Sequence, residues 1–243
     1  MSSLCSVWNH LYSRLGAGSL PPVSQEEMMS ILGFHPPFGE IRWGPFTGNT
    51  TLIRWFHAIN KHFGVTGKGY YMYKAHGYGR TVGLNSNEGK TRLKEALLNP
   101  CAGVLYHCKN HYMVPIGFKD EPKAQVDAYA QTVSEADVDT HIIIGEVSRG
   151  KHSPMHVVKW DNIATDIECQ APYFFNIRQK EKGVQKREKC RRPGGNLHCL
   201  ICFRSDMVEE NLEMFEEGNG AEEEEEQSSG DEKAMASSPA NAE

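Results

Sequence analysis

The sequence predicts an α+β domain in which helices come first and an antiparallel sheet follows. Apolar residues recur at helical spacing near the N-terminus, whereas apolar and β-branched runs occupy residues 102–107, 111–118, 141–147 and 197–203. Segregation of helical and strand-like segments along a chain is typical of the α+β class. With 243 residues, the chain is long enough to bury a sizeable core.

Two short helices are predicted in the first 33 residues. The first has apolar residues at helical intervals: Leu4, Trp8, Leu11 and Leu15. Gly16 and Gly18 are expected to end it. Ser24 and Glu27 have the spacing of a capping box, so a second helix is expected to begin there and to end at Gly33.

A third helix is predicted after an aromatic, loop-like segment at residues 33–48, which we expect to pack against the domain. Asn49 or Thr50 caps this helix and Gly64 ends it. Its apolar face is Leu52, Phe56, Ile59 and Phe63. The remaining predicted elements are a strand at 70–74, a helix at 91–98 and the four strands given above.

Charge divides the chain into a basic body and an acidic tail. Residues 206–243 contain 14 acidic residues and one basic residue, which leaves 25 basic and 17 acidic residues in 1–205, a formal charge of +8. The tail has almost nothing to bury, so we expect 206–243 to be disordered and the folded domain to be 1–205. The tail either binds the basic body or a partner, or it simply aids solubility.

Cysteine usage and hydropathy predict a cytoplasmic or nuclear protein. Seven cysteines without regular spacing fit a reducing compartment better than a disulfide framework. No apolar run reaches the roughly 18 residues of a membrane span, and the N-terminus lacks a signal-peptide pattern. We therefore expect no membrane partner.

The candidate catalytic residues are His111 and Glu146. His111 opens an apolar run, and Glu146 follows an apolar strand that breaks at Gly145. Two neighbouring strands would place the carboxylate behind the imidazole, which is the base and orienting acid of a Cys-His-acid thiol site. The alternative is that His111 is only a satisfied structural residue at the start of a strand.

These segments resemble the His and Asp segments of phytochelatin synthases. The matching motifs are His111-Tyr-Met-Val-Pro-Ile-Gly117, Ile142-Ile-Ile-Gly-Glu-Val-Ser-Arg149 and the Pro-containing stretch 151–154. The resemblance implies a papain-like fold and an activity that transfers γ-glutamylcysteine units. It also implies that Glu146 takes the place of the family's Asp.

Residues 1–205 also resemble the basic immunoglobulin-like variable motif-containing proteins. The shared segments include Trp8-Asn9, Gly44-Pro-Phe-Thr-Gly-Asn-Thr50 and Gly194-Gly-Asn-Leu-His-Cys199. The helix-rich first half nevertheless does not fit an immunoglobulin β-sandwich.

Both resemblances bear on the attacking thiol. In both families a Cys-Gly pair precedes the first helix, and Met1 stands where the next residue would be. Cys5 lies about one turn inside the helix, so it cannot replace that thiol and is expected to be a core residue. We therefore expect this chain to retain His111 and Glu146 without a nucleophile and to be inactive by itself. A full-length form would be a thiol peptidase or a γ-glutamyl or acyl transferase acting on a protein or peptide.

A metal site is the competing interpretation of the cysteines. One group comprises Cys101, His107, Cys108 and His111; the other comprises Cys190, His198, Cys199 and Cys202. The Cys-x2-Cys pair of the second group suits zinc, but strand alternation would place its two thiols on opposite faces. We therefore predict core cysteines, no metal and no cofactor.

A basic segment, Arg178–Arg192, supports a second hypothesis of function. It holds eight basic residues against two acidic ones. Such segments bind nucleic acid, direct nuclear import or remain solvated. No sequence-specific nucleic-acid motif accompanies it. The alternative to a thiol site is thus a non-catalytic interaction module that uses residues 178–192 and the acidic tail. The oligomeric state cannot be read from these patterns.

Overall fold

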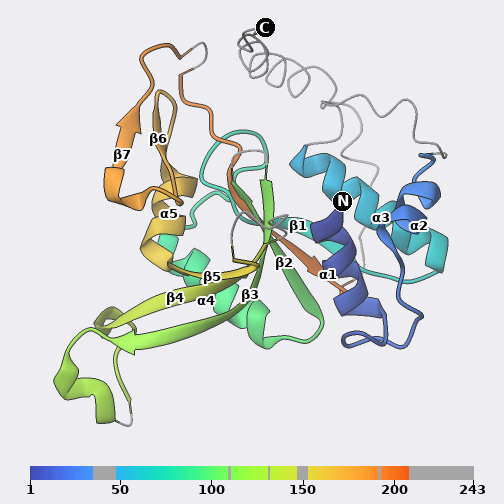
Figure 1. Cartoon of the computed structure of the whole chain (residues 1–243), viewed down its shortest axis with the longest axis horizontal. Helices are drawn as coiled ribbons and strands as arrows, with labels where there is room; N and C mark the ends of the chain where they lie inside the picture. The colour runs from blue at the N-terminus through green and yellow to red at the C-terminus, as the bar shows by residue number, and fades with distance from the viewer. Residues whose placement is uncertain (35–47, 109–110, 131, 147–152, 191–192, 208–243) are drawn as a thin grey trace, which may run out of the picture.

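A computed structural model describes residues 1–34, 48–108, 111–130, 132–146, 153–190 and 193–207. The predicted α+β architecture is confirmed in these ranges (Figure 1). The helices are α1 (Ser2–Tyr12), α2 (Gln25–Ile31), α3 (Asn49–Phe63), α4 (Ser86–Leu98) and α5 (Trp160–Glu168). The strands are β1 (Lys68–Tyr73), β2 (Ala102–Cys108), β3 (His111–Pro122), β4 (Val138–Gly145), β5 (Met155–Lys159), β6 (Tyr173–Phe175), β7 (Val184–Lys186) and β8 (Cys199–Arg204).

Six of these strands form one antiparallel sheet in the order β1-β8-β2-β3-β4-β5. The last strand, β8, therefore lies between β1 and β2, where Cys202 is opposite both Tyr70 and Val104. All residues from Cys199 to Phe203 are buried. A strand covered on both faces reads as a continuous apolar run, which explains the β8 sequence.

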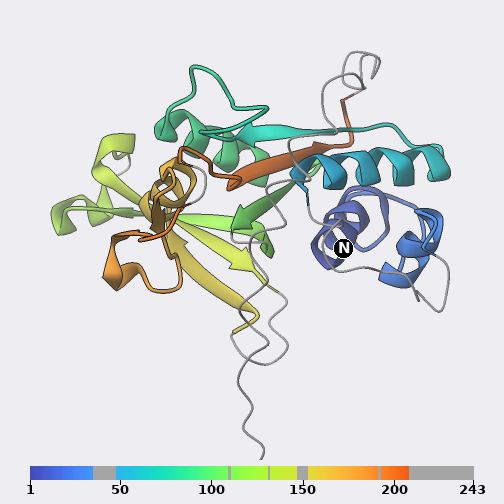
Figure 2. The same ribbon diagram turned by 90° about the horizontal axis from the view of Figure 1, so that it is seen from above.

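The sheet separates two hydrophobic cores because successive strand residues point to opposite faces. Leu105, Ile201 and Phe203 pack with α1, α2 and α3 on one face. Tyr106 and Cys202 pack with α4 and α5 on the other. Figures 1 and 2 show α1–α3 grouped together at one end of the molecule, away from α4 and α5.

Buried polar contacts fix α1 against its neighbours. The Trp8 indole N–H donates to Asn60 Oδ1 of α3 at 2.9 Å, and Asn60 Nδ2 donates to the Tyr12 hydroxyl at 3.1 Å. Asn9 exchanges two hydrogen bonds with the backbone of Val23, at 2.8 and 2.9 Å. These contacts set the position of the first helix relative to the sheet.

Several predicted helix boundaries were wrong for local reasons. Helix α1 ends at Tyr12, and Leu15 is 73% exposed rather than part of the apolar face. Gly48, not Asn49, is the N-cap of α3. The Asn49 side chain instead donates to the Leu197 carbonyl and accepts from the Tyr112 hydroxyl. Helix α4 begins at Ser86, ahead of the predicted residue 91, because a capping box starts it.

Other predictions of helix ends were confirmed. The Ser24 hydroxyl accepts from the Glu27 N–H at the start of α2. Gly64 ends α3 in the left-handed conformation, with φ of 64°. Of the predicted aromatic loop, residues 35–47 lie outside the described residues, as do residues 208–243 of the predicted tail.

No secondary structure was predicted for the segment from β5 to β7. Helix α5 buries Trp160, Ile163, Ala164 and Ile167. This is a helical spacing that the sequence does display. Strands β6 and β7 form a separate two-stranded ribbon. In the described residues, no helix is long and apolar enough to cross a membrane.

Candidate functional site

The structure brings His111 and Glu146 together. Strands β3 and β4 pair with Val114 opposite Gly145, so the start of one lies beside the end of the other. His111 Nε2 is 2.9 Å from Glu146 Oε1. The Nε2 atom is buried but does not meet hydrogen-bond geometry, so the contact is an electrostatic approach rather than an aligned bond. The predicted pair therefore exists as a spatial unit.

Glu146 is the buried centre of this group. Its side chain is 3% exposed, whereas that of His111 is 37% exposed. The Arg178 guanidinium contacts the same oxygen as His111, and His156 Nδ1 lies 3.7 Å from the other oxygen. A carboxylate is stable in a buried position only when such partners replace water. Sequence reasoning missed Arg178 and His156.

Two hydrogen bonds to backbone carbonyls fix the segments that carry His111 and Glu146. The Glu146 N–H donates to the Pro154 carbonyl at 2.9 Å, which returns the chain to β5. The Ser3 hydroxyl of α1 donates to the Tyr112 carbonyl at 2.6 Å, one residue after His111. The first turn of α1 therefore lies against the start of β3, as the sequence predicted.

The pair and α1 nevertheless belong to different faces of the sheet. Tyr112 and Val114 pack with the core formed by α1–α3. His111 alternates with Tyr112 along β3, and Glu146 alternates with Gly145 after Ile144, which lies in the opposite core. His111 and Glu146 therefore point to the face opposite α1, and the start of α1 contacts β3 through the Tyr112 carbonyl.

Cys5 lies within α1, as predicted. Its thiol donates to the Val23 carbonyl at 3.3 Å and accepts from the Asn9 amide at 3.4 Å. Burial raises the pKa of this thiol. A protonated thiol is a poor nucleophile, so Cys5 does not supply an activated sulfur.

The Cys199–Cys202 pair behaves as core. Cys199 packs in the α1–α3 core and Cys202 in the α4–α5 core, so the thiols lie on opposite faces, as predicted. Burial raises the pKa of Cys199 to about 12.

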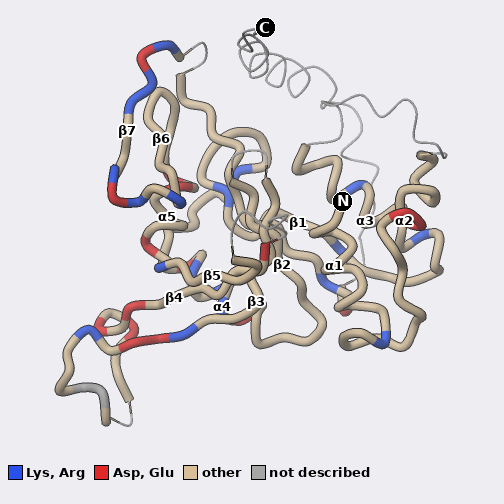
Figure 3. The backbone as a smooth tube through the Cα atoms, in the orientation of Figure 1, with Lys and Arg blue, Asp and Glu red and all other residues tan. Residues whose placement is uncertain are grey.

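The predicted basic segment, residues 178–192, begins after β6 and contains β7. Figure 3 shows Lys and Arg residues along and beyond β7. Lys186 Nζ lies 6.0 Å from the Tyr173 ring centroid, and the Arg187 guanidinium lies 5.2 Å from that of Phe174. Arg178 differs from these residues because it contacts buried Glu146. Residues 191–192 lie outside the described part of the chain.

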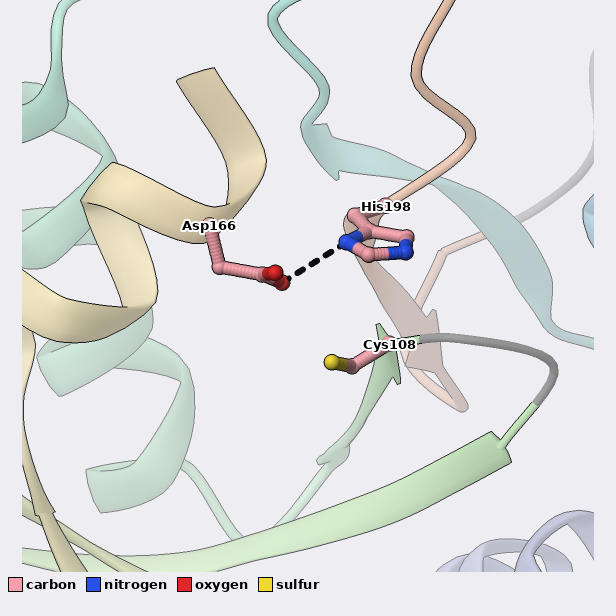
Figure 4. Close-up of side chains that lie close together, drawn as sticks. All are labelled: Cys108, Asp166 and His198. Atoms are coloured by element: carbon pink, nitrogen blue, oxygen red, sulfur yellow. Dashed lines mark hydrogen bonds and ion pairs between the residues drawn. The ribbon is translucent and has the colours of Figure 1, made fainter. Parts of the chain in front are cut away.

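The two Cys/His groups that were considered from the sequence do not form two separate clusters in the structure. His107 stacks on Tyr112 at 4.6 Å, and its Nδ1 lies 2.9 Å from the Leu197 carbonyl. Cys108, from one group, instead lies near His198, from the other, and both lie near Asp166 of α5 (Figure 4). Asp166 was missed because α5 was not predicted.

These features define the class of the protein: an α+β domain with a buried carboxylate–imidazole pair at the end of an antiparallel sheet. The family model "Basic immunoglobulin-like variable motif-containing protein" matches residues 1–210. The chain belongs to this family.

Curated relatives carry the same name. The chain is 50% identical to the Xenopus tropicalis protein over 204 residues and 48% identical to the Homo sapiens protein over 205 residues. Each match covers 84% of this chain and 40% of the relative, so the chain spans less than half the length of these relatives. A Giardia intestinalis protein is 26% identical over 255 residues, which cover 85% of this chain and 90% of that protein. No solved structure matches the chain.

Proposed function

We propose that this domain carries the imidazole and acid of a papain-like thiol site, with His111 as general base and Glu146 as the orienting group. The observation that carries the proposal is the 2.9 Å approach of His111 Nε2 to Glu146 Oε1. The burial of Glu146 fixes the carboxylate, while the partly exposed imidazole stays accessible. The resemblance of both segments to phytochelatin synthases supports the same roles.

The proposed chemistry is acyl transfer from a peptide, isopeptide or γ-glutamyl bond. His111 takes the proton of an attacking thiol, and the resulting thiolate adds to the carbonyl carbon. The imidazolium then returns that proton to the departing amine as the carbon–nitrogen bond breaks. Glu146 stabilises the imidazolium and holds its ring in place.

From the resemblance we infer that the attacking cysteine of a full-length form lies directly ahead of the Met1 position, and the hydrogen bond from Ser3 to the Tyr112 carbonyl supports this inference. A chain that begins Cys-Gly before Met1 tests it. Its labelling rate by a thiol-reactive probe is compared with that of a matched Ser-Gly chain, which reports the background from the seven native cysteines.

We expect the added cysteine to label faster than the background and this excess to fall about a hundredfold in His111→Ala, the lower end of general-base effects. Glu146→Gln should lower it less. An excess rate that is equal with and without His111 would overturn the catalytic proposal.

A second candidate function is binding of single-stranded nucleic acid by the ribbon β6–β7. The observation that favours it is the pairing of Lys186 with Tyr173 and of Arg187 with Phe174. Bases stack on aromatic rings while cations contact phosphates. Tyr173 is 53% exposed, which leaves its ring accessible. A nuclear or cytoplasmic location is part of this proposal.

Fluorescence anisotropy with a single-stranded oligonucleotide at several salt concentrations tests this second candidate. We expect salt-dependent binding that weakens in Tyr173→Ala and in Lys186→Glu. Lys61→Glu, at an exposed position of α3, is the matched charge control. Equal binding by Lys186→Glu and Lys61→Glu would contradict a site on this ribbon.

A further inference from the structure

Cys108, Asp166 and His198 form a compact group on the α5 side of the sheet (Figure 4). Cys108 ends β2, Asp166 lies on α5, and His198 immediately precedes β8. One ligand atom from each residue lies within 4.8 Å of the others. Cys108 is 4% exposed and Asp166 is 1% exposed, whereas the His198 side chain is 18% exposed and gives the group an edge toward solvent.

The Asp166 carboxylate has one oxygen without a partner. Oδ2 accepts from the Tyr106 hydroxyl at 2.5 Å and lies 2.9 Å from His198 Nδ1. Oδ1 is buried and has no hydrogen-bond partner in the described part of the chain. A buried carboxylate oxygen without a donor is energetically costly. A cation bound beside Oδ1 would remove that cost.

A dedicated side chain fixes the group in place. Asn196 Nδ2 donates to the carbonyls of Asp166, Ile167 and Cys169 at 2.8, 3.0 and 2.7 Å, at the end of α5. Its Oδ1 accepts from the His198 N–H at 2.9 Å. Asn196 therefore ties the His198 backbone to the helix that carries Asp166. The site is thus built from three elements that are distant along the chain.

We propose that Cys108 Sγ, the Asp166 carboxylate and the His198 imidazole bind a divalent transition metal of the zinc type. Thiolate and imidazole ligands favour zinc over magnesium or calcium, which prefer oxygen ligands only. Three protein ligands leave a fourth position for water or a substrate atom.

The spacing of the ligand atoms fits such an ion. Ligands bonded to one zinc at about 2.0–2.3 Å cannot lie more than about 4.6 Å apart. The ligand atoms of Cys108, Asp166 and His198 all lie within 4.8 Å of one another, which is close to that value. A small side-chain rotation would therefore bring all three within bonding distance of one ion. Metal binding would release the Cys108 thiol proton, while a neutral His198 imidazole would keep its single proton on the ring nitrogen that does not bind the metal.

Cobalt substitution tests the proposal independently of His111 and Glu146. Co²⁺ bound to a thiolate gives a charge-transfer absorption band in the near ultraviolet, and zinc displaces it. We expect one equivalent of Co²⁺ to produce this band in the wild-type protein and in Cys101→Ser, a matched cysteine control outside the group. The band should be absent in Cys108→Ser. In His198→Gln and Asp166→Asn, the affinity for Co²⁺ should fall at least tenfold, the lower end of ~10–100-fold effects.

Circular dichroism shows whether each variant folds. If Cys108→Ser does not fold, the affinities of the near-isosteric Asp166→Asn and of His198→Gln decide the question. A folded wild-type protein that shows no band and binds no zinc would overturn the proposal, and so would a band that persists in folded Cys108→Ser. Unchanged cobalt affinity in both folded Asp166→Asn and folded His198→Gln would also overturn it.

Discussion

Glu146 Oε1 lies 2.9 Å from His111 Nε2, and the Arg178 guanidinium contacts the same carboxylate oxygen. One buried acid therefore joins the start of β3 to the segment that follows β6. The group positions a half-exposed imidazole, and it also connects two parts of the chain that share no sheet.

Glu146→Gln is expected to destabilise the domain. The substitution keeps the shape of the side chain but removes the charge that His111, His156 and Arg178 approach. Loss of one member of a buried charged group leaves the others unpaired, so we expect a loss of about 2–4 kcal/mol in the free energy of unfolding. Urea denaturation measures it. Exposed Glu27→Gln is the control, and an equal effect of both substitutions would contradict the role of Glu146.

Asn60→Ala is expected to weaken the packing of α1 on α3. The Asn60 amide satisfies both the Trp8 indole N–H and the Tyr12 hydroxyl, which are buried. Its removal leaves the buried indole N–H without an acceptor and should lower the free energy of unfolding by about 2–3 kcal/mol. Thermal and urea unfolding report the change. Exposed His62→Ala on the same helix should have little effect; a similar loss in both variants would count against the hydrogen-bond argument.

Gly18→Ala is expected to distort the turn after α1. A Cβ atom at this position would lie 2.0 Å from the carbonyl carbon of Tyr12, which is backbone and cannot move aside alone. We expect a destabilisation of about 2 kcal/mol or more from this overlap. Exposed Ser19→Ala is the neighbouring control. Unfolding midpoints that are the same for both variants would contradict this close approach.

The ion pairs of Lys94 are expected to make the stability of the fold depend on pH in the acidic range. Its ammonium bonds Glu135 at 2.7 Å and Asp120 at 2.8 Å. The Lys94 hydrogen bond lowers the pKa of Glu135 below its usual 4.5. Partial burial opposes a similar change at Asp120, but the Lys94 and Thr140 hydrogen bonds lower the pKa of Asp120 below 3.8.

A carboxyl group with a lowered pKa stabilises the fold above its unfolded pKa, and that contribution is lost as the pH falls through the folded pKa. Lys94→Met should therefore be less stable than the wild type at neutral pH, with a difference that shrinks below about pH 4. Urea unfolding across this range measures it. A difference that stays constant with pH would contradict the linkage, and Lys61→Met is the exposed control.

The sequence was sufficient for the elements with strong periodicity. The alternation and apolar runs of β2, β3, β4 and β8 were readable because both cores demand them. Asn49 was misread as a cap because its partners, Tyr112 and Leu197, are distant along the chain. Helix α5 has a clear helical spacing and could have been found from it.

The candidate site was readable only in part. His111 and Glu146 stand at the ends of recognisable strands, so their meeting followed from pairing of β3 with β4. Arg178 lies in a basic run, which looks like an ordinary solvated surface. Cys108, Asp166 and His198 come from three separate elements, and only the tertiary fold shows that they meet.

The most direct test of the central claim is a double-mutant cycle between His111 and Glu146. The free energies of unfolding of the wild type, His111→Ala, Glu146→Gln and the double variant are measured in urea at a mildly acidic pH, where a free imidazole is charged. If the imidazole and the carboxylate interact as described, the two effects should fail to add by about 1 kcal/mol or more. Effects that add within error would show that the two groups are not coupled.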